Sequence, residues 1–187
     1  MPGSSSPIDQ APFEAARERL GDDVMRGQVV EGGYRLVEPP ADLPADAPSV
    51  VLAACGAVVP EAYHAARMLA DEGVRATVLD LVSPDRLYRA WRHELDTAAA
   101  AARRPDLERL AIARLLPPSE RRTPIVTVHD AASHALAWLG SVFGQRVHPV
   151  GVDAFGQSGS IAELYDLFHL LPGQLVNAAL TVVEAPA

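Results

Sequence analysis

Four short apolar runs, each followed by a stretch of helical composition, constrain the fold more than any other feature of this sequence. The runs cover residues 49–54, 76–82, 125–128 and 146–150. Each is too short for a helix and lacks the alternation of a half-buried strand, which is typical of a strand buried on both faces. Strands that alternate with helices predict an α/β fold of three layers, α/β/α, around a mostly parallel sheet.

A fifth and shorter strand is expected at 34–37, joined to the next strand by the proline-rich loop 39–48. Because a parallel neighbour needs a long crossover and this connection has no helix, we expect the strand to lie antiparallel at an edge. The prediction is a five-stranded, mostly parallel sheet with one antiparallel edge strand. Helices are expected at 14–26, 60–72, 87–116 with a break at Pro105, 134–143, 160–168 and 174–183.

The chain length of 187 residues fits one domain. We expect residues 1–21 to form a flexible or helical N-terminal extension and residues 22–187 to form a single domain. With 49% hydrophobic and 21% charged residues, the composition is that of a globular protein.

Composition also excludes several functions. The net charge is -8 and no basic stripe offsets it, which excludes a nucleic-acid partner. All 16 basic residues are arginine, which excludes a Gly-Lys-Ser/Thr phosphate loop and a Schiff-base lysine. A single cysteine, no signal peptide and no run of about 20 apolar residues predict a cytoplasmic protein without a membrane partner.

The candidate ligand residues follow the predicted strands, since open parallel sheets bind ligands at the carboxyl ends of their strands. They are Gly56, Ser83, His129, Asp130 and the loop 151–159. The loop precedes a helix, whose start favours an anion. However, Asp153 would repel an anion, and the glycine spacing is not that of a dinucleotide site. Ser83 is also expected to cap the next helix.

Two sites could be catalytic, but each also has a structural interpretation. Cys55 fits a small buried side chain as well as a nucleophile. His129 and Asp130 resemble half of an acid/base pair, but neighbours on an extended chain point to opposite sides. His64, His93 and His169 have no second ligand at metal spacing. We therefore assign no catalytic, cofactor-binding or metal-binding residue to this chain.

The segment Gly151-Val-Asp-Ala-Phe-Gly-Gln-Ser-Gly159, followed by Leu164, Tyr165 and Phe168, resembles a known family. It is similar to the Gly-x-Asp-x-Phe-Gly-x-Ser loop and helix of the C-terminal domain of transketolase-like enzymes, and most similar to the homodimeric pyruvate dehydrogenase first component. The resemblance extends over residues 22–184. It weakens at His129 and at 131–133, where the family carries other residues.

This resemblance implies a role within a larger enzyme. The family binds thiamine diphosphate and Mg²⁺ through a Gly-Asp-Gly segment that ends in Asn-Asn, and its activating glutamate lies in a central domain. Asn177 is the only asparagine here, so this chain alone binds neither. The implied function is a non-catalytic assembly and dimer-support domain of a 2-oxoacid dehydrogenase or transketolase-type enzyme, in a homo- or hetero-oligomer. Its partners are the thiamine-diphosphate-binding and central domains, on the same longer polypeptide or on separate subunits.

By the same resemblance, Gly151, Asp153, Phe155, Gly156 and Ser158 form a structural interface loop. Gly156 is expected to allow a tight turn, and Phe155 to anchor the loop in apolar surroundings. Two alternatives stay open. One is a small-anion binding or regulatory module that acts through its strand-end loops. The other is a free-standing small enzyme that uses Cys55 or the pair of His129 and Asp130.

Overall fold

A five-stranded sheet forms the centre of the protein in the computed structural model, which describes residues 10–183. The strands are β1 (Tyr34–Val37), β2 (Ser49–Cys55), β3 (Arg75–Asp80), β4 (Ile125–His129) and β5 (Val147–Val150), in the order β1-β3-β2-β4-β5. All neighbouring pairs are parallel except β1 and β3, which are antiparallel. The prediction of a mostly parallel sheet with one antiparallel edge strand is confirmed.

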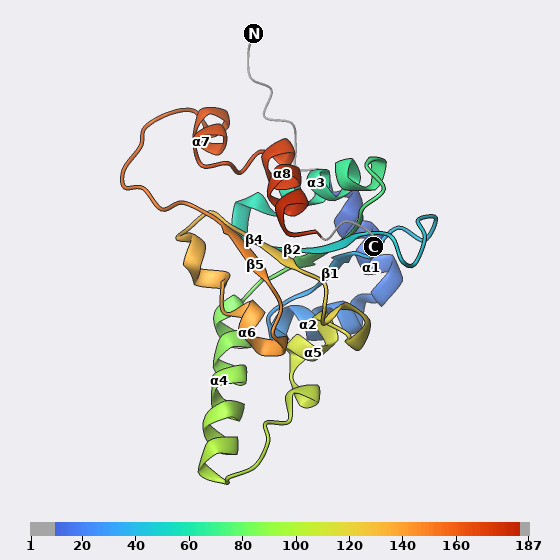
Figure 1. Cartoon of the computed structure of the whole chain (residues 1–187), viewed down its shortest axis with the longest axis vertical. Helices are drawn as coiled ribbons and strands as arrows, with labels where there is room; N and C mark the ends of the chain where they lie inside the picture. The colour runs from blue at the N-terminus through green and yellow to red at the C-terminus, as the bar shows by residue number, and fades with distance from the viewer. Residues whose placement is uncertain (1–9, 184–187) are drawn as a thin grey trace.

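Helices cover both faces of this sheet (Figure 1). The helix α3 (Val59–Asp71) packs with α8 (Pro172–Val182) on one face, while α4 (Pro84–Ala100), α5 (Ala111–Leu115) and α6 (Leu139–Phe143) lie on the other. The central position of β2 in the sheet explains why its sequence is an unbroken apolar run. Leu52 and Ala54 belong to the core beneath α3 and α8, whereas Val51 and Ala53 belong to the opposite core, and all four are fully buried.

The N-terminal helices differ from the prediction. The expected single helix 14–26 is two helices, α1 (Ala11–Leu20) and α2 (Asp22–Glu31), which are separated at Gly21. Gly21 has a φ of 81°, which favours glycine, whereas Gly27 continues α2 at a cost of only about 1 kcal/mol. The helix α1 packs on the domain core, in which Ala16 is fully buried.

Two other helices depart from the expected bounds. The excursion 87–116 does form two pieces, α4 and α5, with Pro105 between them. The expected helix 134–143 is instead a 3-10 turn, Ser133–Leu136, followed by α6. Leu136 at the end of the 3-10 turn and Leu139 at the start of α6 both reach the core. Within residues 10–183, no helix is long and apolar enough to cross a membrane.

The helix α7 (Ile161–Leu167) and the loop before it swing away from the sheet at the upper left of Figure 1. No residue of α7 is buried. The polypeptide leaves the end of β5 and makes this excursion, in which the half-buried Tyr165 and Phe168 still pack against the core. Leu170, which is 1% exposed, is the next fully buried residue.

Candidate functional site

The carboxyl ends of the parallel strands bring most of the predicted strand-end residues together. Cys55 pairs with His129 across β2 and β4, and Ala54 pairs with Asp80 across β2 and β3. Ser83 is the exception. Ser83 takes the predicted N-cap position of α4, but its side chain makes no capping hydrogen bond, and its backbone amide donates to the carbonyl of Gly32, 2.9 Å away.

Asp130 packs against the turn that follows β2. Its Oδ2 accepts a hydrogen bond from the backbone amide of Ala57, 3.2 Å away. Gly56 has a φ of 82°, and a Cβ there would lie 2.6 Å from Asp130 Oδ1. This turn and this carboxylate are thus fitted to each other, and only glycine leaves room for the contact.

His129 lies beside Asp130 rather than opposite to it. The two side chains approach to 3.7 Å between Nε2 and Oδ1, so the expectation that they point apart is wrong. The reason is that β4 ends at His129 and the chain turns there. Nδ1 of His129 is buried and has no hydrogen-bond partner among the described residues.

Asp153 fastens the base of the loop 151–159 to the segment that follows β4. Its Oδ1 accepts from the backbone amide of Ser133 at 2.9 Å, and its Oδ2 accepts from Ser133 Oγ at 2.6 Å. These hydrogen bonds hold the pKa of Asp153 below its usual value. Gly151 permits the close approach, because a Cβ there would lie 2.5 Å from the carbonyl oxygen of Ala131.

These contacts bear on the anion-binding alternative. The backbone amides of Ala57 and Ser133 are the donors that an anion would need at the strand ends, and both already bind carboxylates of the chain itself. A bound anion would have to displace Asp130 or Asp153 and then lie beside the displaced negative charge. The geometry therefore favours an edge whose backbone amides are occupied by carboxylates of the chain over an edge that binds an anion.

A buried carboxylate that we did not predict stands at the end of β3. Tyr34 Oη donates to Asp80 Oδ2 at 2.8 Å, which ties the antiparallel edge strand to the carboxyl edge. Burial raises the pKa of Asp80. Burial and the charges of Asp130 and Asp80 raise the pKa of Cys55 to about 11, so its thiolate is scarce at neutral pH. The position of Asp80 at the last residue of a buried strand was the signal that could have identified it.

The tip of the loop differs from its base. Phe155 is 100% exposed, so the prediction that it lies in apolar surroundings is wrong for this chain by itself. Gly156 has a φ of 60° and forms the expected turn, and Ser158 is exposed. A capping box begins α7, since Ser160 and Glu163 exchange hydrogen bonds between side chain and backbone.

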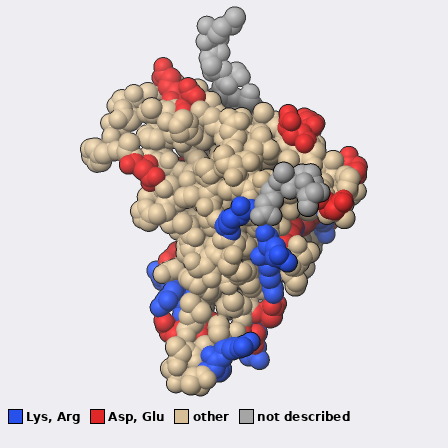
Figure 2. All heavy atoms as spheres, in the orientation of Figure 1, with Lys and Arg blue, Asp and Glu red and all other residues tan. Residues whose placement is uncertain are grey.

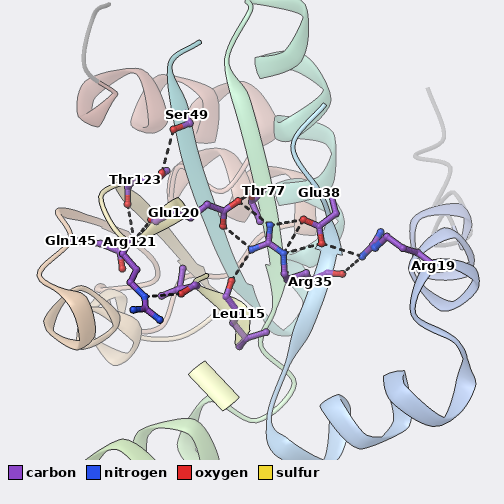
Figure 3. Close-up of polar contacts among 11 residues, drawn as sticks. Arg19, Arg35, Glu38, Ser49, Thr77, Leu115, Glu120, Arg121, Thr123 and Gln145 are labelled. Atoms are coloured by element: carbon purple, nitrogen blue, oxygen red, sulfur yellow. Dashed lines mark hydrogen bonds and ion pairs between the residues drawn. The ribbon is translucent and has the colours of Figure 1, made fainter. Parts of the chain in front are cut away.

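A second polar group lies at the opposite edge of the sheet, where Arg35 of β1 meets Glu120 (Figure 3). Arg35 Nη1 donates to Glu120 Oε2 at 2.7 Å, and Thr77 Oγ1 donates to Glu120 Oε1, also at 2.7 Å. Glu38 and the carbonyl of Leu115 accept from the same guanidinium. A hollow of about 570 Å³ adjoins this group. Because the charged groups bind one another, we interpret this network as one that stabilises the fold. No spacing in the sequence could have indicated it.

The described residues do not fit thiamine diphosphate or its metal ion. No group of three or more His, Cys, Asp or Glu side chains between residues 10 and 183 is arranged to hold a metal ion. The sequence has no Gly-Asp-Gly segment, and its only asparagine, Asn177, is exposed on α8.

The fold and this edge define a class of protein: an α/β domain whose carboxyl edge is fastened by its own carboxylates. Residues 32–171 match the family described as "Transketolase-like TK C-terminal domain". The chain belongs to this family.

Relatives and solved structures agree with this assignment. The plasmid transketolase of Cupriavidus necator is 32% identical over 163 residues, which cover 87% of this chain and 20% of that protein. A structure titled "Split gene transketolase, inactive beta4 tetramer" matches with a TM-score of 0.57 and 24% identity, over 81% of this chain and 42% of that one. The transketolase of Leishmania mexicana matches with a TM-score of 0.56 and 24% identity, over 83% of this chain and 18% of that one.

The chain spans about a fifth of the length of the curated relatives it matches. The structural matches support the fold, a mixed five-stranded sheet flanked by helices. The relatives named here are transketolases, so the narrower resemblance to pyruvate dehydrogenase stays a prediction.

Proposed function

We propose that this chain serves as the non-catalytic C-terminal domain of a thiamine-diphosphate-dependent enzyme of the transketolase type and assembles with the domains that bind the cofactor. The observation that carries the proposal is the contrast within one loop. Asp153 and Gly151 fix its base to the sheet, whereas Phe155 at its tip is wholly exposed.

The contrast indicates docking rather than catalysis. A catalytic loop needs groups that titrate or attack near neutral pH. Here the pKa of Cys55 is raised to about 11, and Asp130 and Asp153 are engaged in hydrogen bonds that fasten the fold. An exposed phenyl ring on a fixed base is instead a typical contact side chain, because its burial against a partner stabilises a complex.

In this proposal Gly151, Asp153, Phe155, Gly156 and Ser158 form the contact loop. The partners are the cofactor-binding and central domains, and the assembled enzyme is an oligomer in the cytoplasm. Transketolase is the activity that the relatives support. A 2-oxoacid dehydrogenase remains the second activity, on the resemblance of the loop alone.

The test is reconstitution. The isolated chain, given thiamine diphosphate, Mg²⁺ and either a ketose phosphate with an aldose phosphate or a 2-oxoacid with an electron acceptor, is expected to show no turnover. Adding the polypeptide of the same genome that carries the Gly-Asp-Gly and Asn-Asn segments is expected to give a complex that coelutes in gel filtration. The substrate pair that the complex then consumes identifies the reaction. Turnover by the isolated chain, or no complex at micromolar concentrations, would refute the proposal.

A further inference from the structure

The loop 153–160 and the helix α7 (Ile161–Leu167) together form an arm, residues 153–167, in which Phe155, Ile161 and Leu167 are exposed while Tyr165 packs against the core. Every residue from 153 to 163 is exposed, and α7 contributes no buried residue. Phe155 is 100% exposed, Ile161 is 73% exposed and Leu167 is 55% exposed. Large apolar side chains grouped on one projecting element are typical of an interaction surface.

The arm is nevertheless held in place at both ends by polar contacts. Asp153 binds Ser133 at its start, and the capping box of Ser160 and Glu163 fixes the beginning of α7. At its end, Gln174 Nε2 donates to Asp166 Oδ1 at 2.9 Å and to the carbonyl oxygen of Asp166 at 3.1 Å. The arm thus has a defined position, so docking would cost little conformational entropy.

The charge of the arm narrows the choice of partner. Its carboxylates, Asp153, Glu163 and Asp166, receive the hydrogen bonds described above from Ser133, Ser160 and Gln174, which are neutral donors. No arginine or lysine follows Arg146 in the sequence. On the face that Figure 2 shows, the surface over α7 carries acidic residues and no basic ones. A complementary partner therefore carries positive charge around an apolar hollow.

A second copy of this chain does not offer such a surface. Nine of its 16 arginines lie between residues 84 and 122, and six of these nine form ion pairs with carboxylates of the described chain. The pairs are Arg89–Asp85, Arg92–Asp96, Arg103–Glu94, Arg109–Asp106, Arg114–Glu31 and Arg121–Glu108. The charge of this segment is largely neutralised within the chain, so a different polypeptide fits the arm better.

We infer that the arm inserts Phe155 into an apolar pocket rimmed by lysine or arginine on the cofactor-bearing polypeptide, with Glu163 and Asp166 facing the basic rim. This inference rests on the proposed function, because it names the chemistry of the surface that receives the arm. It assigns the hydrophobic contact to the tip and the salt-sensitive attraction to α7.

The test is the affinity for that cofactor-bearing polypeptide, measured by titration calorimetry between about 20 and 500 mM NaCl, a range in which exposed charges go from weakly to strongly screened. Phe155→Ala is expected to weaken binding about 30-fold at every salt concentration, as for a hot-spot side chain. The double variant Glu163→Gln/Asp166→Asn keeps the hydrogen-bond acceptors. It is expected to weaken binding roughly fivefold at low salt and to reduce the salt dependence.

The control Glu14→Gln/Glu18→Gln removes two exposed charges from α1 and should bind like the wild type. Phe155→Ala and the control should melt within about 1 °C of the wild type, because their altered side chains are exposed. The α7 variant should melt only slightly lower, because the glutamine and asparagine side chains keep the hydrogen-bond acceptors that Glu163 and Asp166 provide. If Phe155→Ala binds normally, or if the α7 variant leaves the salt dependence unchanged, the inference is overturned while the proposed function stands. If the wild type itself does not bind, the proposed function fails first. Self-association of the chain that Phe155→Ala abolishes would also overturn the inference.

Discussion

Removing the Glu120 side chain should destabilise the protein far more than removing a surface glutamate with the same hydrogen-bonding geometry. Glu120 accepts from both terminal nitrogens of Arg35, at 2.7 and 2.9 Å, and from Thr77 Oγ1 at 2.7 Å. Both charged side chains are 13% exposed. Burial alone would lower the pKa of Arg35, but its hydrogen bonds to Glu120 and Glu38 outweigh that effect and raise it.

The magnitude follows from what Glu120→Ala leaves behind. A buried charge that loses its partner costs about 3–5 kcal/mol. Arg35 keeps Glu38 and the carbonyl of Leu115, which reduces the cost, whereas Thr77 loses its acceptor, which adds to it. We expect a loss of about 2–3 kcal/mol in the free energy of unfolding, and roughly half of that for Glu120→Gln, which keeps the shape of the side chain.

The matched control is Glu108→Ala. Glu108 accepts from Arg121 at 2.7 and 2.9 Å, a nearly identical geometry, but its side chain is 66% exposed. Exposed pairs of this kind contribute about 0.5 kcal/mol. Equilibrium unfolding in urea, followed by the fluorescence of the stacked Trp91 and Trp138, should show a midpoint roughly 1 M lower for Glu120→Ala and almost unchanged for Glu108→Ala. Equal losses in the two variants would refute the argument from burial.

Three further predictions concern the carboxyl edge. Because the pKa of Cys55 is about 11, the native thiol should react with iodoacetamide at pH 8 roughly a hundredfold more slowly than the unfolded chain; equal rates would contradict the assigned environment. Burial raises the pKa of Asp80 above its unfolded value, so its contribution to stability is present at low pH and is lost as the pH rises through the native pKa. Asp80→Asn should therefore melt at a higher temperature than the wild type at pH 7, and this advantage should shrink towards pH 4; a constant difference would argue against burial of the charge. Gly56→Ala should cost about 2–3 kcal/mol, since it adds a contact with Asp130 to an unfavourable φ, whereas Gly73→Ala, with a φ of 75° and open space around it, should cost about 1 kcal/mol in the same urea titration.

Physical reasons separate what the sequence predicted from what it did not. The runs that became β2, β3 and β4 were recognisable because burial on both faces demands uninterrupted apolar side chains. The break at Gly21 was missed, because local propensity does not decide which of two nearby glycines adopts a positive φ. The tie between Arg35 and Glu120 joins residues 85 positions apart, and only the fold brings them together.

The candidate site shows the same division. Because parallel strands end together, their positions at strand ends correctly predicted that Gly56, His129 and Asp130 lie at one edge of the sheet. It could not tell whether Asp130 would face solvent or accept from the amide of Ala57. Phe155 was expected in apolar surroundings, but none of the described residues covers it.

The exposure of Phe155 and the occupied amides of the carboxyl edge have the same structural origin. Asp130 and Asp153 occupy the amides that ligands use in other open sheets, and in doing so they hold the chain rigidly where it leaves β5. A rigid departure lets the loop project a side chain to a fixed point, which a flexible loop could do only by losing conformational entropy on contact. If the chain docks as we propose, the carboxylates that close this edge to a ligand also position the loop for another protein surface. Burial of the Phe155 ring on docking would then contribute about 2–3 kcal/mol to the complex.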